Sequence, residues 1–137
     1  MTDRIKDKTT EIEGYIDELS VILPHNLNEY LDNLEKKAAC ERYFEKIIEA
    51  VVDLAFLIVK EKRLRIPRED KEAFDILSRE KIISQELAEK LKDAKGMRNV
   101  IAHEYGQIDD NLVFHSITED LEEDIRYFIN VIRNALK

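Results

Sequence analysis

The residues of this sequence that could carry out chemistry gather in one short stretch, 98–105, which reads RNVIAHEY. If this stretch is helical, Arg98, Asn99 and His103 lie on one side, and Asn99 and His103 are direct neighbours four residues apart. Arg98 and His103 then lie about 7.5 Å apart along the helix axis. That separation suits two groups that flank a phosphodiester, or two copies of the helix that face each other across a dimer axis. Tyr105 returns to the Arg98 side if the helix continues that far.

These residue types fit phosphate chemistry. An arginine presents a permanently charged, bidentate donor to phosphate oxygens, and a histidine takes or gives a proton near neutral pH. Together they predict metal-independent RNA cleavage, in which His103 deprotonates a 2′-OH and Arg98 stabilises the pentacoordinate phosphate. Asn99 would donate to a phosphate oxygen or hold the histidine tautomer. The alternative is an ordinary solvated helix face with a histidine near the C-terminus, where the helix dipole favours it. The Arg-x4-His spacing alone is a weak pattern that does not decide between the two.

Metal ligation is the weaker interpretation of the same stretch. Beside His103 and Glu104, no second histidine lies at ligand spacing, and Tyr105 is a poor partner for zinc. The single cysteine, Cys40, excludes an intramolecular disulfide and a cysteine-rich metal site. We therefore expect no metal and no cofactor.

The elements that position these residues are predicted to be helices. Only three glycines and two prolines occur, whereas sheets need turns every few residues. Apolar residues at three- and four-residue steps predict amphipathic helices, and the part from 43 to 59 is apolar over such a wide arc that it belongs at the centre of a bundle. The fold class predicted is all-α, an up-and-down bundle of four main helices plus one short helix, in a single domain over 1–137. The expected helices span about 3–22, 26–63, 69–79, 84–103 and 111–136, the last beginning at Thr118 at the latest.

Two residues inside these helices call for an explanation. Asp53 falls within the apolar arc of the long central helix, where a carboxylate is rare unless partnered. We expect it to pair with a lysine or arginine at the boundary of the core; the alternative is that it orients an arginine near the site. Gly96 lies inside a helix, at a cost of about 1 kcal/mol relative to alanine, which indicates close approach by a neighbouring backbone.

The charge and hydropathy of the chain limit its partners. The net charge is −8, which opposes attraction of the whole molecule to nucleic acid. Three lysines accompany Arg98 in the expected motif helix, Lys90, Lys92 and Lys95, and would provide local positive charge. No apolar run approaches the roughly 20 residues of a membrane span, and the N-terminus lacks an apolar signal region. We expect no membrane partner and a cytoplasmic location.

Arg98-x4-His103-x-Tyr105, near the end of the penultimate major helix of a small bundle, resembles the HepT-like members of the HEPN superfamily. The polar Asn99 directly after the arginine fits that pattern. The stretch 41–55, which reads ERYFEKIIEAVVDLA, looks like the family's long central helix. The resemblance covers about residues 1–136.

The resemblance implies a function, partners and a means of control. It implies the toxin of a type VII, HepT/MntA-like toxin–antitoxin system, an endoribonuclease acting on a tRNA or an mRNA as a homodimer. Arg98 and His103 would be catalytic, with Asn99 supporting them. An MntA-like nucleotidyltransferase antitoxin would attach AMP to Tyr105, placing added negative charge where the substrate phosphate binds. The alternative is a non-catalytic subunit that binds a nucleotide, or that serves only as the structural partner of a minimal nucleotidyltransferase.

Overall fold

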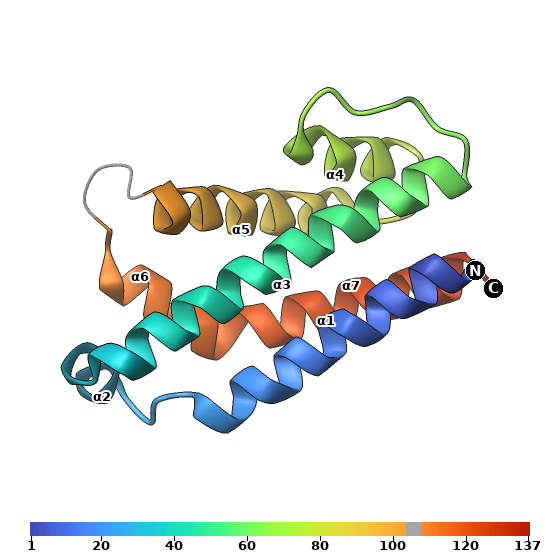
Figure 1. Cartoon of the computed structure of the whole chain (residues 1–137). Helices are drawn as coiled ribbons and strands as arrows, with labels where there is room; N and C mark the ends of the chain where they lie inside the picture. Colours follow the sequence, from blue (N-terminus) through green and yellow to red (C-terminus); the bar gives the residue numbers. More distant parts are fainter. Residues whose placement is uncertain (104–107) are drawn as a thin grey trace.

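Helices make up the described part of the chain, which is residues 1–103 and 108–137 of a computed structural model (Figure 1). No strand occurs among these residues, and the predicted all-α bundle of four long helices is confirmed. Tyr105 lies outside the described residues. In chain order the elements are α1 (Asp3–Ile22), α2 (Leu27–Asp32), α3 (Leu34–Glu61), α4 (Asp70–Arg79), α5 (Gln85–His103), α6 (Asp110–His115), the π-helical segment η1 (Ser116–Asp120) and α7 (Leu121–Ala135).

The start of α5 agrees with the helix expected over 84–103. The Ser84 side chain accepts a hydrogen bond from the backbone N–H of Leu87 at 3.1 Å, which satisfies one of the free donors at the helix N-terminus. From this cap α5 runs to His103 and carries the motif residues Arg98 and Asn99.

The expected helix over 26–63 is wrong as one element, because the chain breaks at Asn33. Asn33 has extended backbone angles, φ −105° and ψ 94°, and its side chain accepts a hydrogen bond from the N–H of Lys36 at 3.0 Å. The side chain thus replaces the helical hydrogen bond that the break removes. Asn26 caps the short α2 in the same way, through the N–H of Glu29 at 2.8 Å.

The last long helix starts earlier than Thr118. Asp109 caps α6 by accepting from the N–H groups of Asn111 and Leu112 at 3.0 and 3.3 Å. The backbone stays helical at His115 and Ser116, so α6 passes through η1 into α7 without a break. Thr118 lies in the π-helical turn, a type of turn often found near functional sites.

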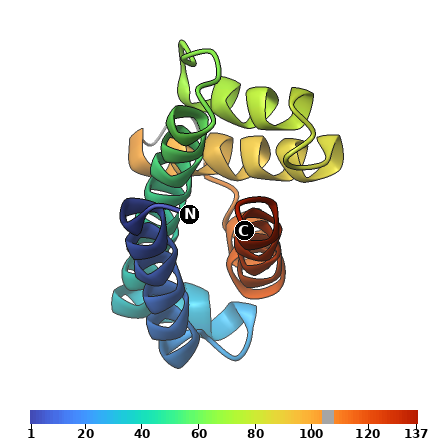
Figure 2. The ribbon, with the colours of Figure 1, turned by 90° about the vertical axis from the view of Figure 1, so that its right-hand side faces the viewer.

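The site is positioned by the packing of α5 against its neighbouring helices. In both views α5 lies between α4, on its outer side, and α7 (Figures 1 and 2). The long α3 crosses the molecule and packs against α1, α4 and α5, as its wide apolar arc predicts. Phe74 of α4 meets Phe128 of α7 edge to face, with ring centroids 6.4 Å apart, and both side chains are fully buried. None of the described helices is long and apolar enough to span a membrane.

Candidate functional site

The C-terminal half of α5 forms one wall of an open cavity of about 650 Å³. The start of α4 forms the opposite wall. The sequence-predicted residues Arg98, Asn99 and His103 all lie on the wall formed by α5, so the structure brings the three together. Tyr105, the fourth residue of the predicted set, follows His103 by two positions and lies outside the described residues. The complete lining is Glu69, Asp70, Lys71, Lys95, Arg98, Asn99 and His103.

Arg98 is held from two sides, and its side chain is only 18% exposed. Its Nη2 donates to the carboxylate of Glu49 on α3, and its Nη1 donates to Oδ1 of Asn99 at 3.4 Å. The Nε atom is buried and has no hydrogen-bond partner among the described residues. An arginine that lines a cavity can bind an anion there, because its guanidinium donates in a planar fork that matches phosphate oxygens.

Sequence reasoning missed Glu49 as the partner of Arg98. It considered Asp53 instead, which lies one helical turn further along α3. The side chain of Asp53 is 63% exposed and pairs with Lys8 of α1 at 3.6 Å, so the predicted lysine pairing is confirmed and the residue is not inside the core. Asp53 and Glu49 both line a second cavity of about 360 Å³, which shares Asp70, Lys95 and Arg98 with the first. The i, i+4 spacing of the two carboxylates was the signal that could have identified Glu49.

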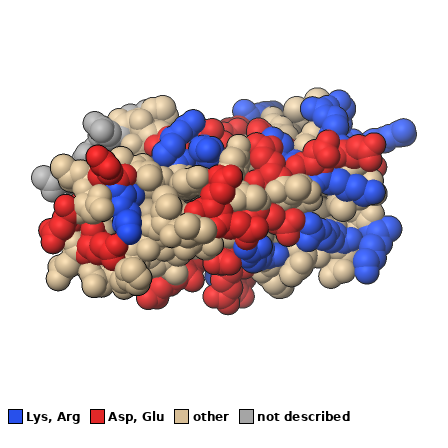
Figure 3. Space-filling view, turned by 60° about the horizontal axis from the view of Figure 1, so that its bottom comes forward, with Lys and Arg blue, Asp and Glu red and all other residues tan. Residues whose placement is uncertain are grey.

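The lysines of α5 do not provide the free positive charge that the sequence suggested. Lys95, 10% exposed, pairs with Asp70 of α4 at 3.1 Å. Lys92 pairs with Asp75 at 3.0 Å, and Lys90 lies 3.8 Å from Asp124. Figure 3, which brings the lower side of Figure 1 forward, shows that basic and acidic side chains also lie next to one another on that side of the molecule. The cationic groups near the site are therefore largely compensated within the chain.

Gly96 faces a side chain and not the neighbouring backbone that the sequence analysis expected. A Cβ placed on Gly96 would lie 3.3 Å from Nζ of Lys71 and 3.9 Å from its Cε. The absence of a side chain at Gly96 thus makes room for the end of Lys71, which comes from the first turn of α4.

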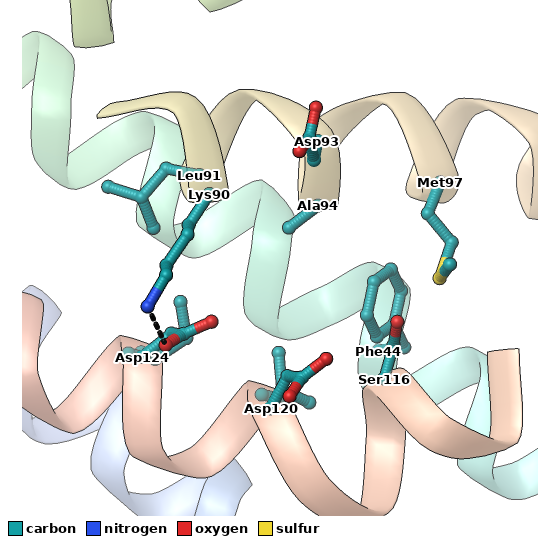
Figure 4. A pocket seen from close by; sticks show the side chains of 11 residues that line it. Phe44, Lys90, Leu91, Asp93, Ala94, Met97, Ser116, Asp120 and Asp124 are labelled. Atoms are coloured by element: carbon teal, nitrogen blue, oxygen red, sulfur yellow. Dashed lines mark ion pairs between the residues drawn. The ribbon is translucent and has the colours of Figure 1, made fainter. Parts of the chain in front are cut away.

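Another cavity, of about 160 Å³, lies on the other flank of α5, between α5 and the η1–α7 segment (Figure 4). Phe44, Leu91 and Met97 contribute to its apolar lining, and Asp120 and Asp124 belong to its polar part. Burial raises the pKa of Asp124 above its usual value. Arg98, Asn99 and His103 are not among its lining residues, so this cavity is separate from the motif wall.

Metal-binding geometry is absent from the described residues, where no group of three or more histidine, cysteine, aspartate or glutamate side chains could hold a metal ion. Cys40 is fully buried in the core. Burial also raises the pKa of its thiol, which keeps the sulfur protonated and unreactive near neutral pH.

The helical bundle, with Arg98, Asn99 and His103 on the cavity wall formed by α5, defines a class of small helical proteins. Comparison with known proteins identifies this class. A family model described as ribonuclease HepT-like matches residues 12–132. The chain is 33% identical over 89 residues to the mRNA nuclease HepT of Shewanella oneidensis, a match covering 65% of this chain and 66% of that protein. It is 30% identical over 119 residues to the tRNA nuclease HepT of Aphanizomenon flos-aquae, covering 87% and 81%.

A solved structure extends the likeness over nearly the whole chain. It is that of a tri-AMPylated HEPN toxin of Shewanella oneidensis in complex with its MNT antitoxin, with a TM-score of 0.91 and 26% identity. The match covers 98% of this chain and 99% of that toxin. The chain therefore belongs to the HepT-like ribonuclease family.

Proposed function

We propose that this protein is the toxin of a type VII, HepT/MntA-like toxin–antitoxin system and cleaves RNA without a metal ion. The observation that carries the proposal is the position of Arg98, Asn99 and His103 on one wall of a cavity large enough for a nucleotide. The family to which the chain belongs, and the RNA nucleases among its relatives, support the same reaction. An RNA substrate would place the activity in the cytoplasm.

The proposed reaction uses the RNA's own nucleophile. His103 removes the proton of a 2′-OH, and the 2′ oxygen attacks the adjacent phosphorus. The bond from phosphorus to the 5′ oxygen breaks, a cyclic phosphate forms, and protonated His103 returns its proton to the leaving oxygen. Arg98 donates to the phosphate oxygens as negative charge builds on them, and Asn99 supports either group. Because Arg98 is paired with Glu49, a phosphate competes with that carboxylate for the guanidinium.

Cleavage assays of four proteins test this reaction: wild type, Arg98→Ala, His103→Ala and His115→Ala. We expect His103→Ala and Arg98→Ala each to lose at least about a hundredfold in kcat/KM, the usual scale for a proton-transfer or charge-stabilising group. His115 is the matched control, because its side chain is 57% exposed on α6 and does not line the cavity. Wild-type activity should persist in excess EDTA. Equal cleavage by wild type and His103→Ala would reject the proposed catalytic role.

The proposed control is AMPylation of Tyr105 by an MntA-like nucleotidyltransferase antitoxin. Tyr105 follows His103, the last residue of α5, by two positions in the sequence. We expect an AMP group on Tyr105 to add a phosphate near the residues that bind the substrate phosphate. The tri-AMPylated state of the Shewanella toxin supports this assignment.

Intact-mass measurement after incubation with the antitoxin and ATP tests the modification. We expect the mass of one or more AMP groups on wild type, none on Tyr105→Phe, and loss of RNA cleavage in proportion to the modified fraction. Tyr127→Phe is the control, because Tyr127 is 55% exposed on α7. Undiminished labelling of Tyr105→Phe would assign the modification to another residue.

A second candidate function is a non-catalytic subunit that binds a nucleotide or only assembles with the nucleotidyltransferase. The pairing of Arg98 with Glu49 and the net charge of −8 favour it, since both weaken attraction to RNA. A purified homodimer that binds a nucleotide, forms the complex with the antitoxin and leaves every RNA intact would support this function over the first.

A further inference from the structure

Lys71 occupies an unusual position for a lysine. It is the second residue of α4, where the positive end of the helix dipole disfavours a cation. Asp70 and Glu72, its neighbours in the first turn, have the charge that this end of a helix favours. Lys71 nonetheless forms no ion pair or hydrogen bond with any residue that the structure describes, and its side chain is only half-buried.

The absence of a side chain at Gly96 leaves room for the end of Lys71. Its Nζ lies against Gly96 of α5, 3.3 Å from where a Cβ would be. An interior helical glycine is unfavourable relative to alanine, so α5 carries an unfavourable residue at the point where the ammonium of Lys71 rests. A lysine that is unfavourable at the start of α4 therefore contacts a glycine that is unfavourable inside α5.

The other cations of the cavity are compensated. Lys95 pairs with Asp70 and Arg98 pairs with Glu49. Of the lysine and arginine side chains that line the cavity, Lys71 is therefore the one without a carboxylate partner in the described part of the chain. An uncompensated ammonium beside the candidate site is available to an anionic ligand.

The helix geometry places this ammonium in line with the motif. Gly96, Asn99 and His103 are spaced i, i+3 and i+7, so they form one stripe along α5. His103 lies about 10 Å along the axis from the level of Gly96, where Lys71 rests. This exceeds the reach of a single phosphate group, so a phosphate at Lys71 and a phosphate at His103 belong to different nucleotides of one strand.

We propose that Lys71, seated over Gly96, forms a second phosphate subsite that binds the RNA backbone next to the cleaved position. The subsite rests on the proposed ribonuclease function for the identity of its ligand. Lys71 is a substrate-binding residue in this arrangement, and His103 and Arg98 remain the reacting groups.

The test is binding of a labelled, single-stranded RNA oligonucleotide of mixed sequence to protein carrying His103→Ala, which prevents cleavage during the measurement. In that background we compare Lys71→Gln, Lys71→Arg, Gly96→Ala and Lys6→Gln by fluorescence anisotropy. Lys6 is the matched control for loss of one charge, because it is exposed on α1 and does not line the cavity.

We expect Lys71→Gln to weaken RNA binding roughly three- to tenfold and to reduce the slope of log Kd against log salt by about 0.7, the contribution of one contact to a single strand. Lys71→Arg should retain most of the affinity. Gly96→Ala should shift binding in the same direction as Lys71→Gln, but by less, because it displaces the ammonium without removing it. With His103 intact, the loss should appear in KM and not in kcat.

Failure of the subsite and failure of the ribonuclease proposal give different results. Equal effects of Lys71→Gln and Lys6→Gln, with wild-type cleavage intact, would reject the subsite alone. A wild type that cleaves no RNA, but whose RNA binding depends on Lys71, would reject the reaction and keep the subsite. Absence of RNA binding by both wild type and the His103→Ala protein, together with absence of cleavage by wild type, would overturn both.

Discussion

At the scale of single residues, the ion pair of Glu49 and Arg98 determines the orientation and the available charge of the guanidinium in the candidate site. Glu49 reaches across from α3 to hold a guanidinium that belongs to α5. The pair fixes the direction of the arginine and leaves its Nη1 on Asn99. It also compensates the positive charge until a phosphate competes for it. Glu49 is in this view a positioning residue, which acts on the substrate only through Arg98.

Replacing Glu49 separates its positioning role from its charge. We expect Glu49→Ala to lower kcat for RNA cleavage roughly tenfold, because a misplaced catalytic group costs rate even when it is still present. Glu49→Gln should recover most of that loss, since the amide oxygen can still accept a hydrogen bond from Arg98. Steady-state kinetics with melting curves of both variants provide the measurement. A Glu49→Gln protein as impaired as Glu49→Ala, or a fall in melting temperature that accounts for the loss, would contradict a positioning role.

At the scale of elements, the junction between α2 and α3 is the clearest departure from a continuous helix. Asn33 closes α2 with its backbone N–H on the carbonyl of Glu29 and opens α3 with its side chain. One residue thus ends one helix and begins the next. The bend allows Tyr30 of α2 to be fully buried and to contact the ring of Phe114 on α6, with centroids 5.5 Å apart.

Removing the cap at Asn33 should weaken this junction. We expect Asn33→Ala to lower the free energy of unfolding by about 1 kcal/mol, the usual cost of losing an N-cap side chain. Urea unfolding followed by circular dichroism measures the change. Asn130→Ala is the control, because Asn130 is exposed in the interior of α7 and caps no helix. A stability equal to that of wild type would mean that the bend at residue 33 does not depend on its side chain.

The same junction carries a pH dependence. Hydrogen bonds from Lys36, at 2.6 Å, and from His25 hold the pKa of Glu29 at about 2, below its ordinary 4.5. A carboxyl whose folded-state pKa is lowered stabilises the fold above its unfolded pKa, and this contribution is lost as the pH falls toward the folded pKa. We therefore expect Glu29→Gln to melt at a lower temperature than wild type at pH 7. The difference should close between about pH 4.5 and about pH 2, and a difference that stays constant over this range would show that Glu29 acts through packing and not through charge.

At the scale of the whole molecule, the position of α5 between α4 and α7 builds the site. α4 supplies the second wall of the cavity, and α7 supports α5 from the other side (Figure 2). The aromatic pair Phe74–Phe128 connects these two outer helices through the core. Stability of the site therefore depends on packing that is remote from Arg98 and His103.

Truncating this aromatic contact should destabilise the whole bundle. We expect Phe74→Ala to cost about 3–5 kcal/mol, the range for removing a buried phenylalanine, which is a large part of the roughly 5–15 kcal/mol of a typical domain. Ile66→Ala is the control, because Ile66 is 81% exposed, and it should change stability by less than about 0.5 kcal/mol. Chemical denaturation of both variants provides the comparison. A loss below about 1 kcal/mol for Phe74→Ala would mean that α4 is not packed firmly on the core.

Local chemistry in the sequence was enough to predict most of the helices. Apolar residues at three- and four-residue steps act over a few residues, so they predicted α1, α4 and α5 without reference to the rest of the chain. The same locality explains the error at Asn33, because an asparagine in a polar stretch is compatible with both a helix interior and a cap. Arg98, Asn99 and His103 could be placed on one face from spacing alone.

Contacts between distant segments were decided by the tertiary structure. Glu49 lies 49 positions before Arg98, and Lys71 lies 27 positions before it. The spacing of Arg98 and His103 contains no information about either residue, because helical periodicity relates only residues of one helix. Packing of α3 and α4 on α5 brought Glu49 to Arg98 and Lys71 to Gly96. The sequence by itself thus determined the motif helix and its polar face. The tertiary fold decided which charges on that face are compensated and which remains available, since compensation depends on distance in space.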